Sequence, residues 1–448
     1  MVAVHLTRLG AQERVVLIDR SPVPARGAAY GTSTDIHLLN VPAARMSALA
    51  DEPGHFLKWA SARAGRDVAP DAFLPRRLYG AYLGDLLAEA QRRGPLRVER
   101  GQAIDVEPIA GGAWRVHRAH GEPVDAGRVV LALGNFAPGD PPVREGAGFY
   151  QHERYQRDPW TPGALQSVAR DEDVLLIGTG LTMLDVALSL AELGHRGVIH
   201  AVSRRGLLPR AHVERPLEIV PGPEPEAWLA SEATARGLLR AVRRAVDETA
   251  ERGDWRGVVD SVRPVTAALW QRMSEREQRR FVRHLRPWWD VHRHRAAASI
   301  MVQIRALIDQ GRLRLSAGRL EGWRVQSGGV EAVVRAKGSG ERRTLRVGRV
   351  LNCTGPESDV ERLTEPLVVR LRERGLIQRD PLGLGVRTTQ DGAIIDADGR
   401  ADGGLHAIGP WRRPRLWETT AVPELSVQAW DLAQALIGAQ VPARRCGG

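Results

Sequence analysis

Short apolar runs that end at a glycine or a polar residue recur along the chain, and they predict buried parallel strands. They are Val15–Asp19, Val129–Gly134, Val174–Ile177, Val198–Val202, Val350–Asn352 and Leu405–Gly409. Helical periodicity covers Met1–Leu9, a segment ending near Arg92, Leu181–Leu190, Arg- and Trp-rich helices from about 221 to 298, and a terminal helix with Thr420 as candidate N-cap. Residues 96–132 alternate like a β meander. This order of elements predicts an α/β protein.

The segment that follows the strand Val174–Ile177 predicts a phosphate-binding turn. Gly178, Thr179 and Gly180 lead directly into a helix whose first turn contains Thr182. A strand, a glycine turn and a helix N-terminus together present free N–H groups and the positive end of the helix dipole to an anion. The third glycine of the usual dinucleotide fingerprint is replaced by Met183, so the motif alone is moderately specific.

The end of the next strand distinguishes between the two nicotinamide cofactors. An acid about 20 residues after the glycines binds the ribose hydroxyls of NADH, whereas basic groups accommodate a 2′-phosphate. Here the position is taken by Ser203, Arg204 and Arg205. The sequence therefore predicts an NADPH site.

The N-terminal strand ends in Asp19 and Arg20, which resembles the second half of a nucleotide-binding βαβ unit. A preceding strand and glycine loop would place Asp19 about 20 residues after that loop, where a ribose-binding acid belongs. We therefore expect a gene start upstream of Met1, and a weakly flavinated, nearly colourless protein when the chain begins at Met1. The alternative is a helix and strand without a nucleotide role.

Composition and charge remove several other classes of function. The chain has 448 residues, 43% of them hydrophobic, and a formal net charge of +11. Lys58 and Lys337 are its two lysines, and the arginines are dispersed, so we expect an ordinary solvated surface and no nucleic-acid partner. Cys353 and Cys446 form no CxxC pair, and His292 and His294 have the wrong spacing for one helix face, which argues against zinc or another metal. We expect a cytoplasmic protein without a membrane anchor; the oligomeric state is left open.

Several long motifs make the family recognisable. They are Gly27–Gly31, His37–Ser47, Leu74–Gly80, Gly178–Asp185, Ser203–Arg210, Asn352–Pro356 and Trp417–Glu424. They resemble the bacterial FAD/NAD(P)-binding oxidoreductases, a group similar to the urate hydroxylase and L-aspartate N-monooxygenase flavoproteins. The resemblance covers nearly the whole chain, although the family's N-terminal strand and Gly-x-Gly-x-x-Gly loop do not occur in it.

This resemblance implies two Rossmann-like three-layer nucleotide-binding domains, the second inserted in the first, plus a helical insertion. The FAD domain would comprise residues 1–160 and 345–448, and the NADP domain residues 161–344 with the helical insertion at about 221–298. Carried over by position, the residues that would contact FAD, or follow strands at its edge, are Asp19, Arg20, Asn40, Arg45, Met46, Arg76, Gly134, Gly355, Gly409, Thr420 and Ala421.

Three further residues are candidates for substrate or flavin contacts. Asn135 follows Gly134 and is the candidate catalytic residue, although an asparagine that caps a turn fits equally well. Arg293 and His294 are candidates for binding an acidic substrate, and a solvated helix face is the alternative.

The implied function is an FAD- and NADPH-dependent monooxygenase that hydroxylates a small molecule with O2 through a C4a-hydroperoxyflavin. Its substrate would be an amine or a heterocycle. One alternative is an NADPH-dependent flavin reductase or dehydrogenase. Another is a non-catalytic, truncated relative with impaired FAD binding.

Overall fold

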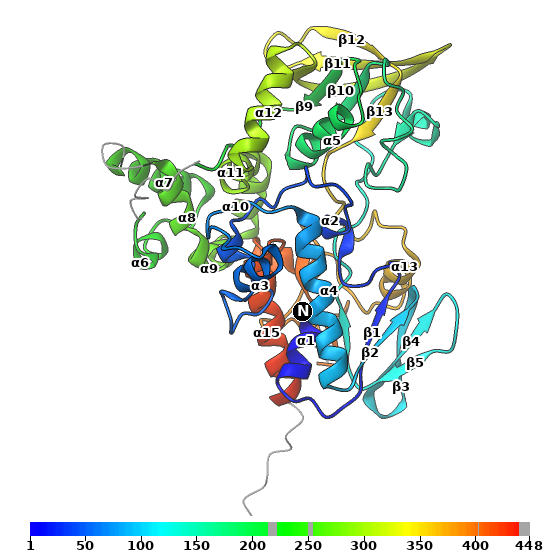
Figure 1. Cartoon of the computed structure of the whole chain (residues 1–448), viewed down its shortest axis with the longest axis vertical. Coiled ribbons are helices and arrows are strands. Elements are labelled where there is room, and N and C mark those ends of the chain that lie inside the picture. Colours follow the sequence, from blue (N-terminus) through cyan, green and yellow to red (C-terminus); the bar gives the residue numbers. More distant parts are fainter. Residues whose placement is uncertain (214–221, 250–253, 402, 439–448) are drawn as a thin grey trace, which may run out of the picture. The chain divides into compact units, whose positions relative to one another are not determined.

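A computed structural model describes residues 1–213, 222–249, 254–401 and 403–438 (Figure 1). The predicted start of the helical insertion at Pro221 and the second cysteine, Cys446, lie outside these residues. The chain divides into two compact units. Unit 1 comprises Met1–Asn135, Thr266–Gln271 and Ser358–Gly448, and unit 2 comprises Phe136–Val265 and Arg272–Glu357.

Unit 2 is built on a seven-stranded sheet with the order β12-β11-β10-β9-β8-β13-β7. The strands are β7 (Tyr155–Gln156), β8 (Val174–Ile177), β9 (Ile199–Ser203), β10 (Leu313–Gln326), β11 (Gly329–Ala336), β12 (Arg342–Val347) and β13 (Arg349–Asn352). Strands β10, β9, β8, β13 and β7 are parallel neighbours, and β11 and β12 extend the sheet in antiparallel fashion. All four residues of β8 are buried, as the continuous apolar run predicts for a strand covered on both faces.

Helix α5 (Leu181–Glu192) follows β8 and packs against α12 (Ala298–Asp309), which also contacts β10 (Figure 1). Eight consecutive residues of α5, from Met183 to Leu190, are buried. A helix that is apolar on nearly all sides needs such a cover, because a surface helix would expose one polar face.

The stretch predicted to be a helical insertion is helical. It contains α6 (Pro225–Leu229), α7 (Ala235–Thr249), α8 (Trp255–Ser261), the 3₁₀ turn η4 (Arg263–Val265), α9 (Thr266–Arg272), α10 (Glu275–Arg280), the π-helical turn η5 (Phe281–Leu285) and α11 (Arg286–Arg293). Helices α10 and α11 are joined directly through η5. One segment was not foreseen: residues 266–271 of α9 are part of unit 1, although the helices around it are part of unit 2.

Unit 1 contains three small sheets. Strand β1 (Val15–Asp19) pairs in parallel with β2 (Leu96–Arg100), and β6 (Val129–Leu131) pairs in parallel with β14 (Leu405–Ala407). Strands β3 (Ala103–Ile109), β4 (Ala113–Arg118) and β5 (Val124–Ala126) form an antiparallel sheet. The predicted meander over 96–132 is therefore wrong at both ends, because alternation identifies a strand but does not identify its partner.

Helices cover these sheets. Helix α1 (Val2–Arg8) packs against α4 (Arg76–Arg93) and α15 (Val422–Gly438), while α3 (His55–Ala64) adds Phe56 to a buried aromatic cluster with Tyr79 and Tyr82. Shorter elements are α2 (Gly27–Tyr30), η1 (Ala43–Arg45), η2 (Ala110–Gly112), η3 (Ala147–Gln151), α13 (Pro366–Glu373), η6 (Gly409–Arg412) and α14 (Arg413–Leu416). No helix among the described residues has the length and apolar character that crossing a membrane requires.

Candidate dinucleotide site

The glycine turn between β8 and α5 has the geometry expected of a phosphate cradle. Gly178 has φ +115°, and a Cβ there would lie 2.5 Å from the carbonyl oxygen of Cys353 in the segment after β13, so a side chain is excluded. At Gly180, which caps the twelve-residue helix α5, a Cβ would meet no heavy atom within 4 Å. This open space in front of a helix N-terminus fits an anionic phosphate group.

Of the residues in the first turn of α5, Met183 departs from the usual fingerprint and Thr182 does not. Met183 takes the place of the third glycine and is completely buried, so this side chain forms part of the helix–sheet contact. Thr182 is only half-buried in the first turn of α5. The substitution at Met183 therefore affects the packing of α5 and leaves the mouth of the turn unobstructed.

Thr179 and Ser203 connect the glycine turn to the segment that follows β9. Their hydroxyl oxygens are 2.8 Å apart, and the Thr179 hydroxyl also donates to the carbonyl oxygen of Leu207 at 2.5 Å. Because a hydroxyl carries one proton, Thr179 accepts from Ser203. The Ser203 oxygen in turn accepts from the N–H of Gly206 at 3.0 Å. The proton of Ser203 is thus already used within the protein, and the structure gives this residue a positioning role.

Arg204 and Arg205 follow directly after this hydroxyl pair. Arg204 is exposed and makes no hydrogen bond or ion pair with any described residue. Burial of part of its side chain lowers the pKa of the Arg204 guanidinium, and three nearby guanidinium groups lower it further. These belong to Arg286, Arg205 and Arg319. Such a concentration of positive charge is suited to a phosphate dianion.

In unit 1, Asp19 at the end of β1 holds its own loop together. One carboxylate oxygen accepts from the N–H of Ser21 at 2.8 Å and the other from the N–H of Ala25 at 2.9 Å. Ala25 has φ +68°, a left-handed conformation that such local bonds help to hold. Arg20, the other predicted residue here, is exposed.

The segment His37–Ser47 is tied to the start of α4 by Arg76. Its backbone N–H donates to the carbonyl oxygen of His37 at 2.7 Å, and its Nε donates to that of Leu38 at 3.0 Å. Met46 is buried in the aromatic core, whereas Arg45 is exposed. Asn40 is half-buried. Cofactor contacts by these residues stay a prediction.

The parallel pair β6 and β14 directs two predicted loops to one edge. Both strands end there, so Gly134 and Asn135 leave the sheet beside Gly409. The Gly409 carbonyl accepts from the hydroxyl of Thr419 at 2.8 Å, and that hydroxyl accepts from Gln428 Nε2 at 2.9 Å. In α/β proteins such carboxyl edges are the usual position of ligand crevices.

The remaining predicted positions are Thr420 and Ala421, before α15 in unit 1, and Gly355 in unit 2. Thr420 is exposed, and the helix begins at Val422, so Ala421 precedes it and the prediction of Thr420 as N-cap is displaced by one residue. Gly355, which belongs to unit 2, has φ +90° and no atom within 4 Å of an added Cβ.

Trp417 is a residue that the sequence did not mark as unusual. It has φ +58° and ψ −62°, and the N–H of Glu418 donates to the carbonyl of Leu416 at 2.7 Å, which defines a strained γ-turn. The Trp417 ring packs 4.7 Å from that of Trp270 in α9, whose Nε1 donates to the carbonyl of Pro414 at 2.7 Å. Positive φ at a tryptophan has no sequence signal, so only the structure reveals this turn.

The candidate substrate residues lie in and after α11. Arg293 is 9% exposed, so the alternative of a solvated helix face is wrong for this side chain. The adjacent Arg295 is also buried and pairs with Asp260. His294 is half-buried. A substrate role for Arg293 and His294 stays a prediction. Among the described residues, no group of three or more His, Cys, Asp or Glu side chains is placed to hold a metal ion.

The chain is similar to known proteins in sequence over its N-terminal part and in fold along nearly its whole length. The FAD-NAD(P)-binding family matches residues 1–136. No curated protein matches the sequence. Ornithine hydroxylase PvdA from Pseudomonas aeruginosa is 16% identical with a TM-score of 0.65, covering 98% of this chain and 96% of that one. L-lysine 6-monooxygenase from Pseudomonas syringae is 16% identical with a TM-score of 0.59, covering 98% and 97%. Bacillithiol disulfide reductase YpdA from Staphylococcus aureus is 12% identical with a TM-score of 0.56, covering 98% and 94%.

These similarities define the class of fold as that of the two-domain FAD/NADP flavoproteins of Rossmann type, which confirms the predicted fold class. The family match over the first 136 residues confirms the predicted resemblance to FAD/NAD(P)-binding proteins. The chain is similar to the FAD/NAD(P)-binding oxidoreductases.

Proposed function

We propose that this protein is an FAD- and NADPH-dependent oxidoreductase that hydroxylates a small molecule with O2. The observation that carries the proposal is the turn at Gly178–Gly180, which is open at Gly180. It lies beside the strand that leads to Arg204, a residue without a hydrogen-bonding or ion-pair partner in the described part of the chain. A phosphate cradle and a basic group at these two positions fit a dinucleotide with a 2′-phosphate. The similarity of fold to flavin monooxygenases along 98% of the chain supports the same function.

The residues of unit 2 would hold NADPH in a defined way. The N–H groups at the start of α5 would bind the pyrophosphate, which the missing side chain at Gly180 allows to approach the backbone. Arg204 and Arg205 would bind the 2′-phosphate, while the Thr179–Ser203 hydroxyl pair keeps the two loops in register.

Unit 1 has groups that fit FAD. The Asp19 carboxylate uses two of its roughly four acceptor positions on loop N–H groups, which leaves two for ribose hydroxyls. The sheet edge at Gly134 and the exposed Thr420, which precedes α15, would face the isoalloxazine ring of FAD. When bound, NADPH supplies a hydride and FAD supplies the flavin that reacts with O2.

We infer a small amine as the substrate, because the similar structures include hydroxylases of ornithine, lysine and cadaverine. We also infer a cytoplasmic protein. A flavin-dependent reductase is the second candidate, since bacillithiol disulfide reductases share the fold. Burial, and to a lesser extent the charge of Asp185, raises the pKa of the Cys353 thiol, so a reductase of this chain would not pass electrons through that residue.

The test compares three readouts on the protein supplied with FAD. NADPH oxidation, O2 consumption and hydroxylated product are measured with L-ornithine, L-lysine and cadaverine, and with amine omitted as control. Amine-dependent O2 uptake that yields a hydroxylamine would support the monooxygenase. NADPH oxidation that depends on an artificial acceptor and forms no such product would indicate the reductase. A protein that binds neither nucleotide would be the non-catalytic relative.

A further inference from the structure

The helical insertion meets the nucleotide-binding sheet at the end of β9. The guanidinium carbon of Arg205 lies 5.9 Å from the ring centroid of Trp288, which is in α11 and is 43% exposed. Arg205 Nη2 also donates to the carbonyl oxygen of Arg283, in the π-helical turn η5, at 3.4 Å. Interruptions of this kind in helices occur often at functional sites.

A second basic residue reaches the same edge from β10. In the parallel pair β9–β10, Ser203 is opposite Ala317. Arg205 and Arg319 each lie two residues beyond that pair, Arg205 just after the end of β9 and Arg319 where β10 continues past it, so both segments bring a guanidinium to the end of β9. The approach of the two segments is close, because a Cβ added to Gly206 would lie 3.1 Å from the Cβ of Ala317.

The charge at this edge is incompletely balanced. Arg204 has no hydrogen-bonding or ion-pair partner among the described residues, and the charges of Arg286, Arg205 and Arg319 act to lower its pKa. Arg286 is paired with Asp290 at 3.3 Å. The repulsion between the guanidinium groups persists unless an anion binds among them.

The two kinds of group match the two parts of one ligand. A 2′-phosphate accepts hydrogen bonds only, and the proton of Ser203 is already donated to Thr179, so arginine side chains must supply the donors. An adenine ring is flat and aromatic, and it stacks on tryptophan and on guanidinium planes. The Arg205–Trp288 pair offers both surfaces.

We propose that the helical insertion completes the adenine end of the NADPH site. Trp288 and the guanidinium plane of Arg205 form the stacking shelf for the adenine, and Arg286 and Arg319 join Arg204 and the N–H edge of Arg205 in binding the 2′-phosphate. This inference rests on the proposed NADPH function. It assigns the insertion a role in cofactor selection in addition to any role in substrate binding.

The test is isothermal titration calorimetry with NADP⁺ and NAD⁺, which bind without turnover. Trp288→Ala should weaken binding of both nucleotides by about tenfold, because both contain adenine, and Trp288→Phe should restore it. Arg286→Ala and Arg319→Ala should each weaken NADP⁺ binding by about tenfold or more and leave NAD⁺ binding unchanged.

Matched controls remove one arginine from the same elements. Arg283→Ala deletes an exposed side chain beside α11, and Arg324→Ala deletes one on β10; neither should alter binding of either nucleotide. Circular dichroism and thermal unfolding verify that each variant is folded. Unchanged NADP⁺ affinity in Trp288→Ala, or equal losses for both nucleotides in Arg286→Ala, would overturn the inference.

Failure of the inference can be separated from failure of the proposed function. Gly180→Asp places a carboxylate in the phosphate cradle and should abolish NADP⁺ binding. If Gly180→Asp abolishes binding while the Trp288 and Arg286 variants do not change it, the NADPH function stands and the role of the insertion is rejected. If the unaltered protein binds no NADP⁺, both are rejected. Selective NADP⁺ binding without hydroxylated product would reject the monooxygenase alone.

Discussion

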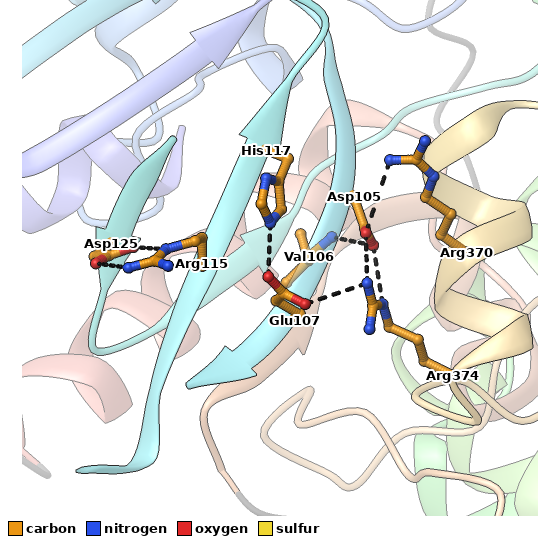
Figure 2. Close-up of polar contacts among 8 residues, drawn as sticks. All are labelled: Asp105, Val106, Glu107, Arg115, His117, Asp125, Arg370 and Arg374. Atoms are coloured by element: carbon orange, nitrogen blue, oxygen red, sulfur yellow. Dashed lines mark hydrogen bonds and ion pairs between the residues drawn. The ribbon is translucent and has the colours of Figure 1, made fainter. Parts of the chain in front are cut away.

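Replacement of Asp105 by asparagine should loosen helix α13 from the antiparallel sheet of unit 1. Figure 2 shows Asp105 on β3 facing Arg370 and Arg374. Its carboxylate accepts from Arg374 Nη2 at 2.7 Å and Nε at 3.2 Å, and from the N–H of Val106 at 2.9 Å. Arg370 lies 3.8 Å away. The asparagine retains the shape of the side chain and removes the charge that both arginines face.

The loss of stability in Asp105→Asn depends on which groups still solvate or pair with the two arginines. Breaking a fully buried ion pair costs about 3–5 kcal/mol, because the remaining charge is stranded. The Asp105 side chain is only 6% exposed, but that of Arg374 is 40% exposed and keeps Glu107 at 3.2 Å. The remaining charge is therefore solvated and partly paired. We expect a loss of about 1–2 kcal/mol, which corresponds to a roughly five- to thirtyfold larger population of the locally open state.

Native-state hydrogen exchange isolates this effect, because it reports the opening of α13 rather than unfolding of the whole chain. The amides of residues 367–373 in α13 should lose protection in Asp105→Asn. The control is Asp125→Asn, which breaks the equally bidentate pair with Arg115 at 2.8 Å on the exposed side of the same sheet (Figure 2). That variant should leave α13 unchanged. Equal protection of α13 in Asp105→Asn and the unaltered protein would refute the reasoning.

The contribution of Asp105 should also depend on pH. Burial by itself raises the pKa of this carboxyl, but the hydrogen bonds and charge of Arg374 outweigh it, and the net effect lowers the pKa. A group with a lowered folded pKa stabilises above its unfolded pKa, about 3.9, and this contribution is lost as the pH falls through the folded value. The difference between the two proteins should therefore be constant near neutral pH and shrink below about pH 4.

Three further changes test other parts of the structure. Gly178→Ala should cost about 2–5 kcal/mol in thermal unfolding, since φ +115° and a close carbonyl oppose a Cβ, whereas Gly180→Ala should remain folded. Trp270→Ala should cost about 3–5 kcal/mol by removing the contact with Trp417; a smaller loss than in an exposed-residue control would contradict this packing role. Thr179→Val should cost about 1–2 kcal/mol and weaken NADP⁺ binding, and Thr179→Ser should restore both.

The parts of the fold that sequence could predict are those with local causes. Strand β8 is apolar at every position, and Gly178 and Gly180 follow it directly. The strand and the turn can therefore both be predicted from fewer than ten consecutive residues. The pairing of β6 with β14 joins residues 276 positions apart, as the partners His406 and Val130 show. Nothing within either strand specifies that partner, which is why the predicted meander failed at its ends.

The candidate site likewise contains residues that local sequence could predict and residues that it could not. Residue types near the glycine turn predicted an anion site because the chemistry depends on neighbours in sequence. The contribution of Trp288 depends on the path of a helix more than 80 residues after β9, and no local pattern encodes that path. The buried ring of Trp270 likewise gives no indication that α9 packs in unit 1.

Hydrogen-bond capacity explains how predicted ligands can also serve as structural residues. Asp19 bonds to backbone groups of its own loop and Arg76 to those of the segment His37–Leu38, which taken alone would argue against cofactor binding. A carboxylate has about four acceptor positions and a guanidinium five donors, so each retains capacity after these bonds form. Ser203 differs, because its single proton is committed to Thr179 and its oxygen already accepts from Gly206. Local bonding would thus orient Asp19 and Arg76 for the proposed ligand but removes Ser203 as a donor, so that recognition of a 2′-phosphate would depend on the arginines.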